Sequence, residues 1–297
     1  MTYLRDDLKA LFPERTVEAF LAIDGETVKQ EVASRRTYRF ERGGHAFYMK
    51  AHFGVGWREI VKNLFQLKRP VLGAENEWRA IRRFEQPEVG IETMRLAACG
   101  KQGWNPARQR SFIMTDALDD TVDLEHWLPE LGQWPNRAER LRLKRAIIRR
   151  LGDIGRRLHG SGMNHRDFYL CHFRLDMSKA APLPNVDDLH IYLMDLHRVE
   201  QYKKLPERWA VKDIAGLLYS ALYDSKGIAL NRSDMIRFIE AYTGQHWREA
   251  MIDRRDFWRR VLQRIMRTYK KDKGVVAPLP ACLQAWYEQN SNINEAK

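Results

Sequence analysis

The sequence predicts an α+β fold of two lobes, an N-terminal antiparallel sheet with helices followed by a mainly α-helical C-terminal lobe. From Glu26 the apolar spacing approaches two residues, which is typical of strands that bury one face. From Arg137 onwards apolar residues recur at helical spacing in long segments. We place the lobe boundary after residue 116, so the predicted lobes are residues 1–116 and 117–297.

The N-terminal lobe is expected to contain five strands and four helices. Gly43 and Gly44 join the second and third strands as a hairpin. Pro70 and Pro87 end the last two helices. The expected strands span residues 28–33, 37–41, 46–51, 91–98 and 110–115, and the expected helices span residues 3–12, 16–23, 57–68 and 74–86.

The C-terminal lobe is expected to be organised around one long helix. After Pro135-Asn136 an uninterrupted apolar stripe runs over residues 137–159, and Gly160 to Gly162 end it. Further helices are predicted at residues 209–223, 233–242 and 247–270, with a loose tail after Pro278.

The surface is predicted to be strongly basic. Lys and Arg number 51 against 39 Asp and Glu, which gives a net charge of +12 at pH 7. Such a surplus favours anionic partners, whether phosphorylated glycans, acidic lipid headgroups, an acidic protein or nucleic acid. Composition alone does not choose among them.

Three other features of the sequence bear on location. It has no run of 18 or more apolar residues, so no transmembrane helix is expected. The first residues carry acids early, which argues against a secretory signal. The three cysteines share no Cys-x-x-Cys spacing. A reducing, cytoplasmic setting fits these features best.

A catalytic-loop motif follows the long helix. His165-Arg166-Asp167 is the order in which a protein-kinase-like fold presents the Asp that orients the acceptor hydroxyl and takes its proton. An apolar run then ends in Asp195, as does the strand before the Asp that binds Mg²⁺ in such folds. The order predicts a protein-kinase-like fold that uses ATP and Mg²⁺, with Asp167 as base and Asp195 as metal ligand.

Two residues of the N-terminal lobe complete this pattern. Lys50 closes the third strand, where such a fold keeps the Lys that binds the α- and β-phosphates. Glu77 lies on the inward stripe of the helix over residues 74–86, with Ile81 and Phe84. We expect Glu77 to form an ion pair with Lys50. A solubilising Lys and a solvated Glu are the alternatives.

The turn between the first two strands, Ser34-Arg35-Arg36, departs from the usual Gly-rich phosphate loop. It contains no Gly. Arg35 and Arg36 either meet phosphate oxygens directly or belong to a plain exposed turn.

The position five residues after Asp167 holds His172, where protein kinases have a metal-binding Asn. Imidazole nitrogen is a poorer ligand for Mg²⁺ than oxygen. Either neutral His172 supplies a weaker metal site, or it contacts phosphate as a donor. Leu196-His197 likewise replace the usual Phe-Gly after Asp195, which favours a constitutively assembled metabolic enzyme.

Taken together, these residues resemble the lipopolysaccharide kinase family, the core heptose(I) kinases with their Kdo-kinase relatives. The resemblance covers about residues 26–260. It is carried by Arg-Thr-Tyr-Arg-Phe at 36–40, Gly-Val-Gly-Trp-Arg-Glu-Ile at 54–60, Gly-Ala-Glu-Asn-Glu-Trp at 73–78, Gly-Met-Asn-His-Arg-Asp at 162–167, Cys-His-Phe at 171–173 and Asp-Leu-His-Arg at 195–198. In that family, His at position 172 is the expected residue.

The resemblance implies transfer of the ATP γ-phosphate to a hydroxyl of the first heptose of the lipopolysaccharide inner core. It implies that Asp167, Arg166 and Lys50 are catalytic, with Asp195 as metal ligand. The implied partners are the inner-core glycolipid, the anionic surface of the inner membrane and an acyl carrier protein, and no nucleic acid is expected. The implied location is the cytoplasmic face of the inner membrane, as a peripheral protein.

Three other functions compete with this one. A Kdo kinase would share the same motifs. A protein kinase, acting on tyrosine for example, would favour an Ala-Pro-Glu segment after Asp195, and the nearest match is Leu205-Pro206-Glu207. A basic binding module for membrane or nucleic acid would have no need of Lys50 and the two Asp residues together.

Overall fold

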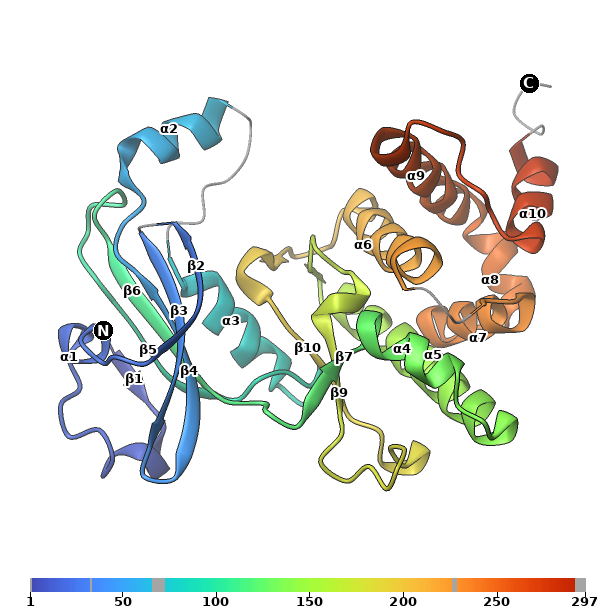
Figure 1. Cartoon of the computed structure of the whole chain (residues 1–297). Helices are drawn as coiled ribbons and strands as arrows, with labels where there is room; N and C mark the ends of the chain where they lie inside the picture. Colours follow the sequence, from blue (N-terminus) through green and yellow to red (C-terminus); the bar gives the residue numbers. More distant parts are fainter. Residues whose placement is uncertain (1, 33, 66–72, 226–228, 292–297) are drawn as a thin grey trace. The chain divides into compact units, whose positions relative to one another are not determined.

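The computed structural model describes residues 2–32, 34–65, 73–225 and 229–291, which divide into two compact units (Figure 1). We call them the sheet unit and the helical unit. The sheet unit comprises Met1–Glu88, Thr93–Asp119 and Asp195–Val199. The helical unit comprises Val89–Glu92, Asp120–Met194 and Glu200–Lys297.

Within the described residues, the sheet unit is built on a six-stranded antiparallel sheet with the order β1-β5-β6-β4-β3-β2. The expected β3–β4 hairpin is confirmed, and its two turn residues, Gly43 and Gly44, have positive φ angles of 59° and 76°. The strands are β1 (Thr2–Leu4), β2 (Glu26–Val32), β3 (Arg35–Arg42), β4 (His45–His52), β5 (Leu96–Gln102) and β6 (Arg110–Asp116).

Alternation along β4 decides which side chains enter the core and which face the next helix. Phe47, Met49 and Ala51 are fully buried in an aromatic core with Phe12 and Phe20 of the N-terminal segment. Because successive side chains of a strand point to opposite faces, Lys50 points away from this core. Its neighbour on that side is helix α3 (Glu75–Phe84), which packs on β5 and β6.

The N-terminal segment corrects one prediction. Residues 3–12 were expected to be helical, but β1 pairs with β5, and a 3-10 turn follows at Asp6–Leu8. The spacing of Leu4, Leu8 and Phe12 misled the prediction because all three are buried without a continuous helix. Edge pairing with β5 satisfies the backbone instead. The second predicted helix is present as α1 (Val17–Leu21).

One further boundary of the sheet unit differs from expectation. The strand predicted from residue 91 begins only at Leu96, because Val89–Glu92 belongs to the helical unit, where Glu92 O accepts a hydrogen bond from Leu193 N. The helix predicted over residues 57–68 is present as α2 (Gly56–Phe65), and residues 66–72 lie outside the described part of the chain.

The helical unit is organised around α5 (Arg137–Gly160), which confirms the long helix expected before the catalytic motif. Asn136 caps its N-terminus by accepting hydrogen bonds from the amides of Ala138 and Glu139. The other helices are α4 (Leu124–Gly132), α6 (Glu207–Tyr219), α7 (Arg232–Thr243), α8 (Trp247–Asp253), α9 (Arg255–Lys273) and α10 (Ala281–Ser291).

Two small antiparallel sheets carry the loops of this unit. One has the strand order β10-β9-β7, and the other pairs β11 with β8. The strands are β7 (Thr121–Asp123), β8 (Met163–Asn164), β9 (Phe173–Asp176), β10 (Ile191–Leu193) and β11 (Glu200–Gln201).

The C-terminal region corrects two predictions. The helix expected over residues 247–270 is broken at Arg254, whose guanidinium lies 4.1 Å from the centre of the Phe257 ring. The expected loose tail contains α10, because Pro278 and Pro280 precede a helix, where proline is tolerated. Among the described residues, no helix is both long enough and apolar enough to span a membrane.

Candidate active site

The sheet unit places Lys50 and Glu77 in direct contact. Lys50 Nζ lies 2.6 Å from Glu77 Oε1, so the expected ion pair is present. The Glu77 side chain is only 1% exposed, whereas Lys50 is 22% exposed. A carboxylate that is buried to this degree requires a cation, since an unpaired buried charge costs several kcal/mol. Glu77 therefore fixes the Lys50 ammonium group while leaving it accessible from one side.

Asp195 belongs to the same unit and lies beside this pair. Its Oδ1 atom is 3.9 Å from Lys50 Nζ, and the Nδ1 atom of His197 is 2.5 Å from the same oxygen. The backbone of Asp195 is left-handed, with φ 57° and ψ 56°. This conformation is unfavourable for a residue with a Cβ and is typical of functional positions. The sheet unit thus brings together three of the predicted site residues, Lys50, Glu77 and Asp195.

Asp213 holds the backbone of the His165-Arg166-Asp167 motif in the helical unit. Its carboxylate is 1% exposed and accepts hydrogen bonds from His165 N at 2.6 Å and Arg166 N at 2.9 Å. The fully buried His165 ring lies between the loop and β10, with its Nε2 atom 2.8 Å from Met194 O. These contacts determine the backbone path that leads into Asp167.

Arg166 has a left-handed backbone, with φ 72°, and its side chain is held on several sides. Its Nη1 donates to Glu200 Oε1 at 2.9 Å, and its guanidinium lies 4.9 Å from the centre of the Trp209 ring. Lys212 donates to the Arg166 carbonyl. Arg166 thus anchors the loop, and Asp167 follows it directly in the chain.

His172 is tied to the backbone of Asp167. Its Nδ1 atom lies 2.6 Å from the Asp167 carbonyl oxygen. Since a carbonyl oxygen only accepts, the Nδ1 atom carries the proton, and in neutral imidazole the lone pair then belongs to Nε2. An imidazole whose Nδ1–H donates to a carbonyl is the usual arrangement of a metal-binding His.

The two arginines that were predicted to lie in a turn are the first residues of strand β3. Arg36 Nη2 lies 2.7 Å from Asp24 Oδ1, and its guanidinium stacks 4.9 Å from the centre of the Tyr38 ring. Arg35 is half-buried and pairs in register with His52 of β4. To reach phosphate, Arg36 would have to leave Asp24.

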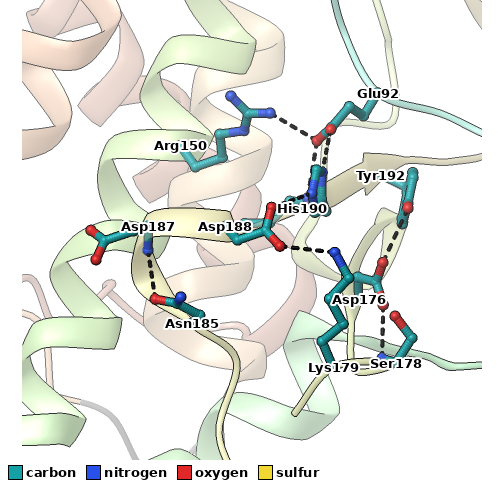
Figure 2. Close-up of polar contacts among 11 residues, drawn as sticks. Glu92, Arg150, Asp176, Ser178, Lys179, Asn185, Asp187, Asp188, His190 and Tyr192 are labelled. Atoms are coloured by element: carbon teal, nitrogen blue, oxygen red, sulfur yellow. Dashed lines mark hydrogen bonds and ion pairs between the residues drawn. The ribbon is translucent and has the colours of Figure 1, made fainter.

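The sequence did not indicate the role of Glu200, the contact of His197 with Asp195, or a polar network around Glu92. Glu92 bridges Arg150 of α5 and His190, and His190 reaches Asp188 with its other ring nitrogen (Figure 2). The apolar neighbours of Glu92 in the sequence could have indicated a carboxylate that needs partners, because Ile91 and Met94 are buried beside it. Nothing in the local sequence indicates the partner of Arg166.

The donor set of the sheet unit fits a magnesium nucleotide. Among the described residues, no group of three or more His, Cys, Asp or Glu side chains could hold a metal ion. Mg²⁺ does not need such a cage, because it is usually held by one or two carboxylates with substrate phosphates and waters. Asp195 offers a carboxylate that is 35% exposed, and Lys50 offers a cation for the phosphates.

The fold has a close counterpart among solved structures. The structure described as WaaP in complex with acyl carrier protein superimposes with a TM-score of 0.73 and 34% identity, over 91% of this chain and 99% of that chain. Fold and site together define a phosphotransferase with a protein-kinase-like fold.

Sequence comparison narrows this class. The model of the lipopolysaccharide kinase (Kdo/WaaP) family matches residues 18–242, and the chain belongs to this family. It is 41% identical over 251 residues to the lipopolysaccharide core heptose(I) kinase WaaP of Pseudomonas aeruginosa, covering 84% of this chain and 89% of the relative. It is 37% identical over 254 residues to the Escherichia coli K12 protein of the same name, covering 84% and 90%.

Proposed function

We propose that this phosphotransferase transfers the γ-phosphate of ATP to a hydroxyl of the first heptose of the lipopolysaccharide inner core. The observation that carries the proposal is the set formed by Lys50, Glu77 and Asp195 in a chain that is 41% identical to a core heptose(I) kinase. Positioned charge is what phosphoryl transfer requires from a protein, and these residues supply it.

The sheet unit would hold the nucleotide. Lys50 would bind α- and β-phosphate oxygens, with Glu77 fixing its direction at 2.6 Å. Asp195 would bind Mg²⁺, which when bound neutralises charge on the β- and γ-phosphates. Arg35 and Arg36 would add phosphate contacts if Arg36 exchanged Asp24 for phosphate.

The helical unit would orient the acceptor. Asp167 would accept a hydrogen bond from the sugar hydroxyl and take its proton as the new bond forms. Arg166 would act through the loop that it anchors to Glu200. His172 would serve as a metal ligand through Nε2, because its Nδ1 proton is engaged by the Asp167 carbonyl.

The basic surface would serve the acceptor and its surroundings. A net charge of +12 suits a glycolipid that carries phosphates and carboxylates and an anionic inner membrane, at whose cytoplasmic face the protein would act as a peripheral enzyme. An acyl carrier protein is a further partner, since the solved relative is described in complex with one.

An Asp167→Ala variant tests the catalytic assignment. We expect ADP release with a heptose–Kdo–lipid acceptor to fall by about 10²–10⁴-fold, because the hydroxyl loses the group that orients it and accepts its proton. Asp187→Ala is the matched control, since the Asp187 side chain is 79% exposed and its ion-pair partner, Arg142, is itself exposed. Comparable turnover in the wild type and the Asp167 variant would refute the assignment.

An acceptor comparison separates the competing functions. The purified enzyme with ATP and Mg²⁺ is given the heptose–Kdo–lipid, the lipid with Kdo but no heptose, or a peptide pool containing tyrosine. Phosphate incorporation into the first acceptor alone supports a heptose kinase. Incorporation into the second indicates a Kdo kinase, and incorporation into peptide indicates a protein kinase.

A further inference from the structure

Helix α2 presents large apolar side chains to solvent. Trp57 is 57% exposed, Val61 44%, Leu64 57% and Phe65 86%. The first three follow the spacing i, i+4 and i+7, so they form one stripe along the helix, and Phe65 continues it. Ile60 is 6% exposed and fastens the helix to the unit. Globular proteins rarely expose a contiguous stripe of this kind without a partner for it.

A second segment projects beside α2. The loop between β5 and β6 carries Trp104, which is 93% exposed. Gly56 at the start of α2 donates to Ala107 O of this loop at 3.0 Å, and Gly54 lies so close that an added Cβ would be 2.8 Å from the same carbonyl. The two segments therefore belong to one end of the sheet unit, where Figure 1 shows α2 beyond the ends of the strands.

Cations border these apolar side chains. Arg58 and Lys62 are exposed along one flank of α2, and Arg108 and Arg110 are exposed on the neighbouring loop and strand. The Arg110 guanidinium lies 5.7 Å from the centre of the ring of Phe53, which is itself exposed. Glu59 is the one acid on α2, and it is 3.5 Å from Lys62. We call this combined surface, α2 with residues 103–110 and Phe53, the aromatic–basic end.

We propose that the aromatic–basic end is the surface that docks on an anionic lipid bilayer, with the apolar side chains of α2 and Trp104 inserted at the headgroup boundary. An apolar helix face with Trp and Phe and flanking Arg and Lys is the pattern of an interfacial helix. A groove on a protein partner would accommodate α2 alone, whereas α2 and the loop with Trp104 together fit the flat surface of a bilayer. The cations match acidic headgroups. The proposal rests on the proposed function, since a membrane-linked acceptor gives the contact its purpose.

Vesicle co-sedimentation of the full chain, without ATP or acceptor, tests the surface directly. We expect the chain to pellet with phosphatidylglycerol–phosphatidylethanolamine vesicles and only weakly with phosphatidylcholine vesicles. Leu64→Ser/Phe65→Ser should lower the partition coefficient at least about tenfold, because two inserted apolar side chains are lost. Trp104→Ser should lower it independently. Ile252→Ser/Val276→Ser is the matched control, since both residues are exposed apolar side chains of the helical unit.

The outcomes separate this proposal from the proposed function. Absence of vesicle binding by the wild type, or unchanged binding by both the α2 and the Trp104 variants, overturns the surface assignment. Unchanged vesicle binding with lost retention on an acyl carrier protein column would show a protein-docking surface instead. Thermal unfolding followed by circular dichroism confirms that the variants fold. A chain that binds vesicles through α2 but does not phosphorylate heptose refutes only the proposed function.

Discussion

Arg166 shows how one strained residue is kept in place by its surroundings. A left-handed conformation costs a residue with a Cβ roughly 1–2 kcal/mol, and the φ of Arg166 is 72°. Asp213 engages its amide, Lys212 its carbonyl and Glu200 its guanidinium. Tyr202 donates to the other oxygen of Glu200 at 2.5 Å, so the carboxylate is itself fixed. The loop that leads into Asp167 is therefore held by side chains of the helical unit itself.

Glu200→Gln tests this arrangement. The pair is largely buried, with 19% of the Arg166 side chain and 14% of the Glu200 side chain exposed. Removal of one charge leaves a buried cation without its partner, so we expect the free energy of unfolding to fall by about 2–3 kcal/mol and kcat to fall with it. Urea unfolding and steady-state kinetics measure both.

Glu41→Gln is the control for the Glu200 variant. It removes a 65% exposed partner of Arg39 and should change the free energy of unfolding by less than about 1 kcal/mol. Equal losses in the two variants would contradict a special role for Glu200.

At this scale, the sequence predicts contacts whose positions follow from regular elements. The Lys50–Glu77 pair could be predicted because the strand end and the inward helix stripe fix both side chains. The Arg166–Glu200 pair could not, because it depends on the pairing of two strands of two residues each, β8 and β11. The left-handed backbone of Asp195 could not be predicted from the sequence either, because contacts in the folded protein are what stabilise such a conformation.

Helices α5 and α7 are joined by a buried ion pair. Lys144 Nζ lies 2.6 Å from Asp234 Oδ2 and 2.7 Å from Ala229 O, and both side chains are less than 10% exposed. Asp234 also closes the capping box at the start of α7 with Asn231. One carboxylate thus connects a helix start to the neighbouring helix.

Lys144→Met should destabilise the helical unit by about 3 kcal/mol, because Asp234 would remain buried without its main cation. Lys144→Met/Asp234→Asn removes the stranded charge while keeping a side chain that caps, so it should recover part of that loss. Urea unfolding of both variants measures the difference. A double variant no more stable than the single one would show that the charge of Asp234 is not the cause.

Element prediction succeeded where periodicity was long and ends were marked. α5 has 24 residues, an Asn cap and, just beyond its C-terminal cap, Gly162 with φ 81°, and its bounds agree with expectation to one residue. Prediction was wrong for residues 3–12, where three buried side chains imitate helical spacing, and after Pro278, where two prolines imitate a loop. At the N-terminus, pairing with the distant strand β5 decides the backbone.

At the scale of the whole molecule, the two units are interleaved along the chain. The four residues Val89–Glu92 belong to the helical unit, although the residues before and after them belong to the sheet unit. Their anchor is the network in Figure 2, in which Glu92 Oε1 lies 2.6 Å from His190 Nδ1 and Glu92 Oε2 lies 2.8 Å from Arg150. Asp188 lies 2.9 Å from His190 Nε2. Because two carboxylates accept from one ring, the network favours imidazolium.

The network makes stability depend on pH. The hydrogen bond to Glu92 raises the pKa of His190 above its ordinary value of 6.5, burial lowers it, and the contact with Asp188 raises it further. Its stabilisation is therefore complete below pH 6.5 and is lost as the pH rises through the higher folded pKa. Burial raises the pKa of Glu92, but the hydrogen bonds from His190 and Arg150 outweigh burial and lower the pKa below its ordinary value of 4.5. Glu92 therefore stabilises the fold at pH values above 4.5, and this stabilisation is lost as the pH falls through the lower folded pKa.

We therefore expect the free energy of unfolding to decrease more between pH 6 and pH 9 in the wild type than in His190→Gln, by about 0.2–1 kcal/mol for a partly exposed pair. Urea unfolding at the two pH values measures this. The comparison between variants cancels the titration of the other histidines. Parallel decreases in both proteins would show that His190 is not charged in the folded state.

The interleaving of the two units also sets the order of events during synthesis. Asp195–Val199 completes the sheet unit and contacts α3, yet it emerges from the ribosome only after residues 120–194 of the helical unit. At 5–20 residues per second, the eighty residues from 120 to 199 delay that completion by roughly 4–16 s. The sheet unit is therefore incomplete until Asp195–Val199 has been synthesised. Because the segments of the two units alternate along the chain, truncation of the gene at one position yields neither unit complete.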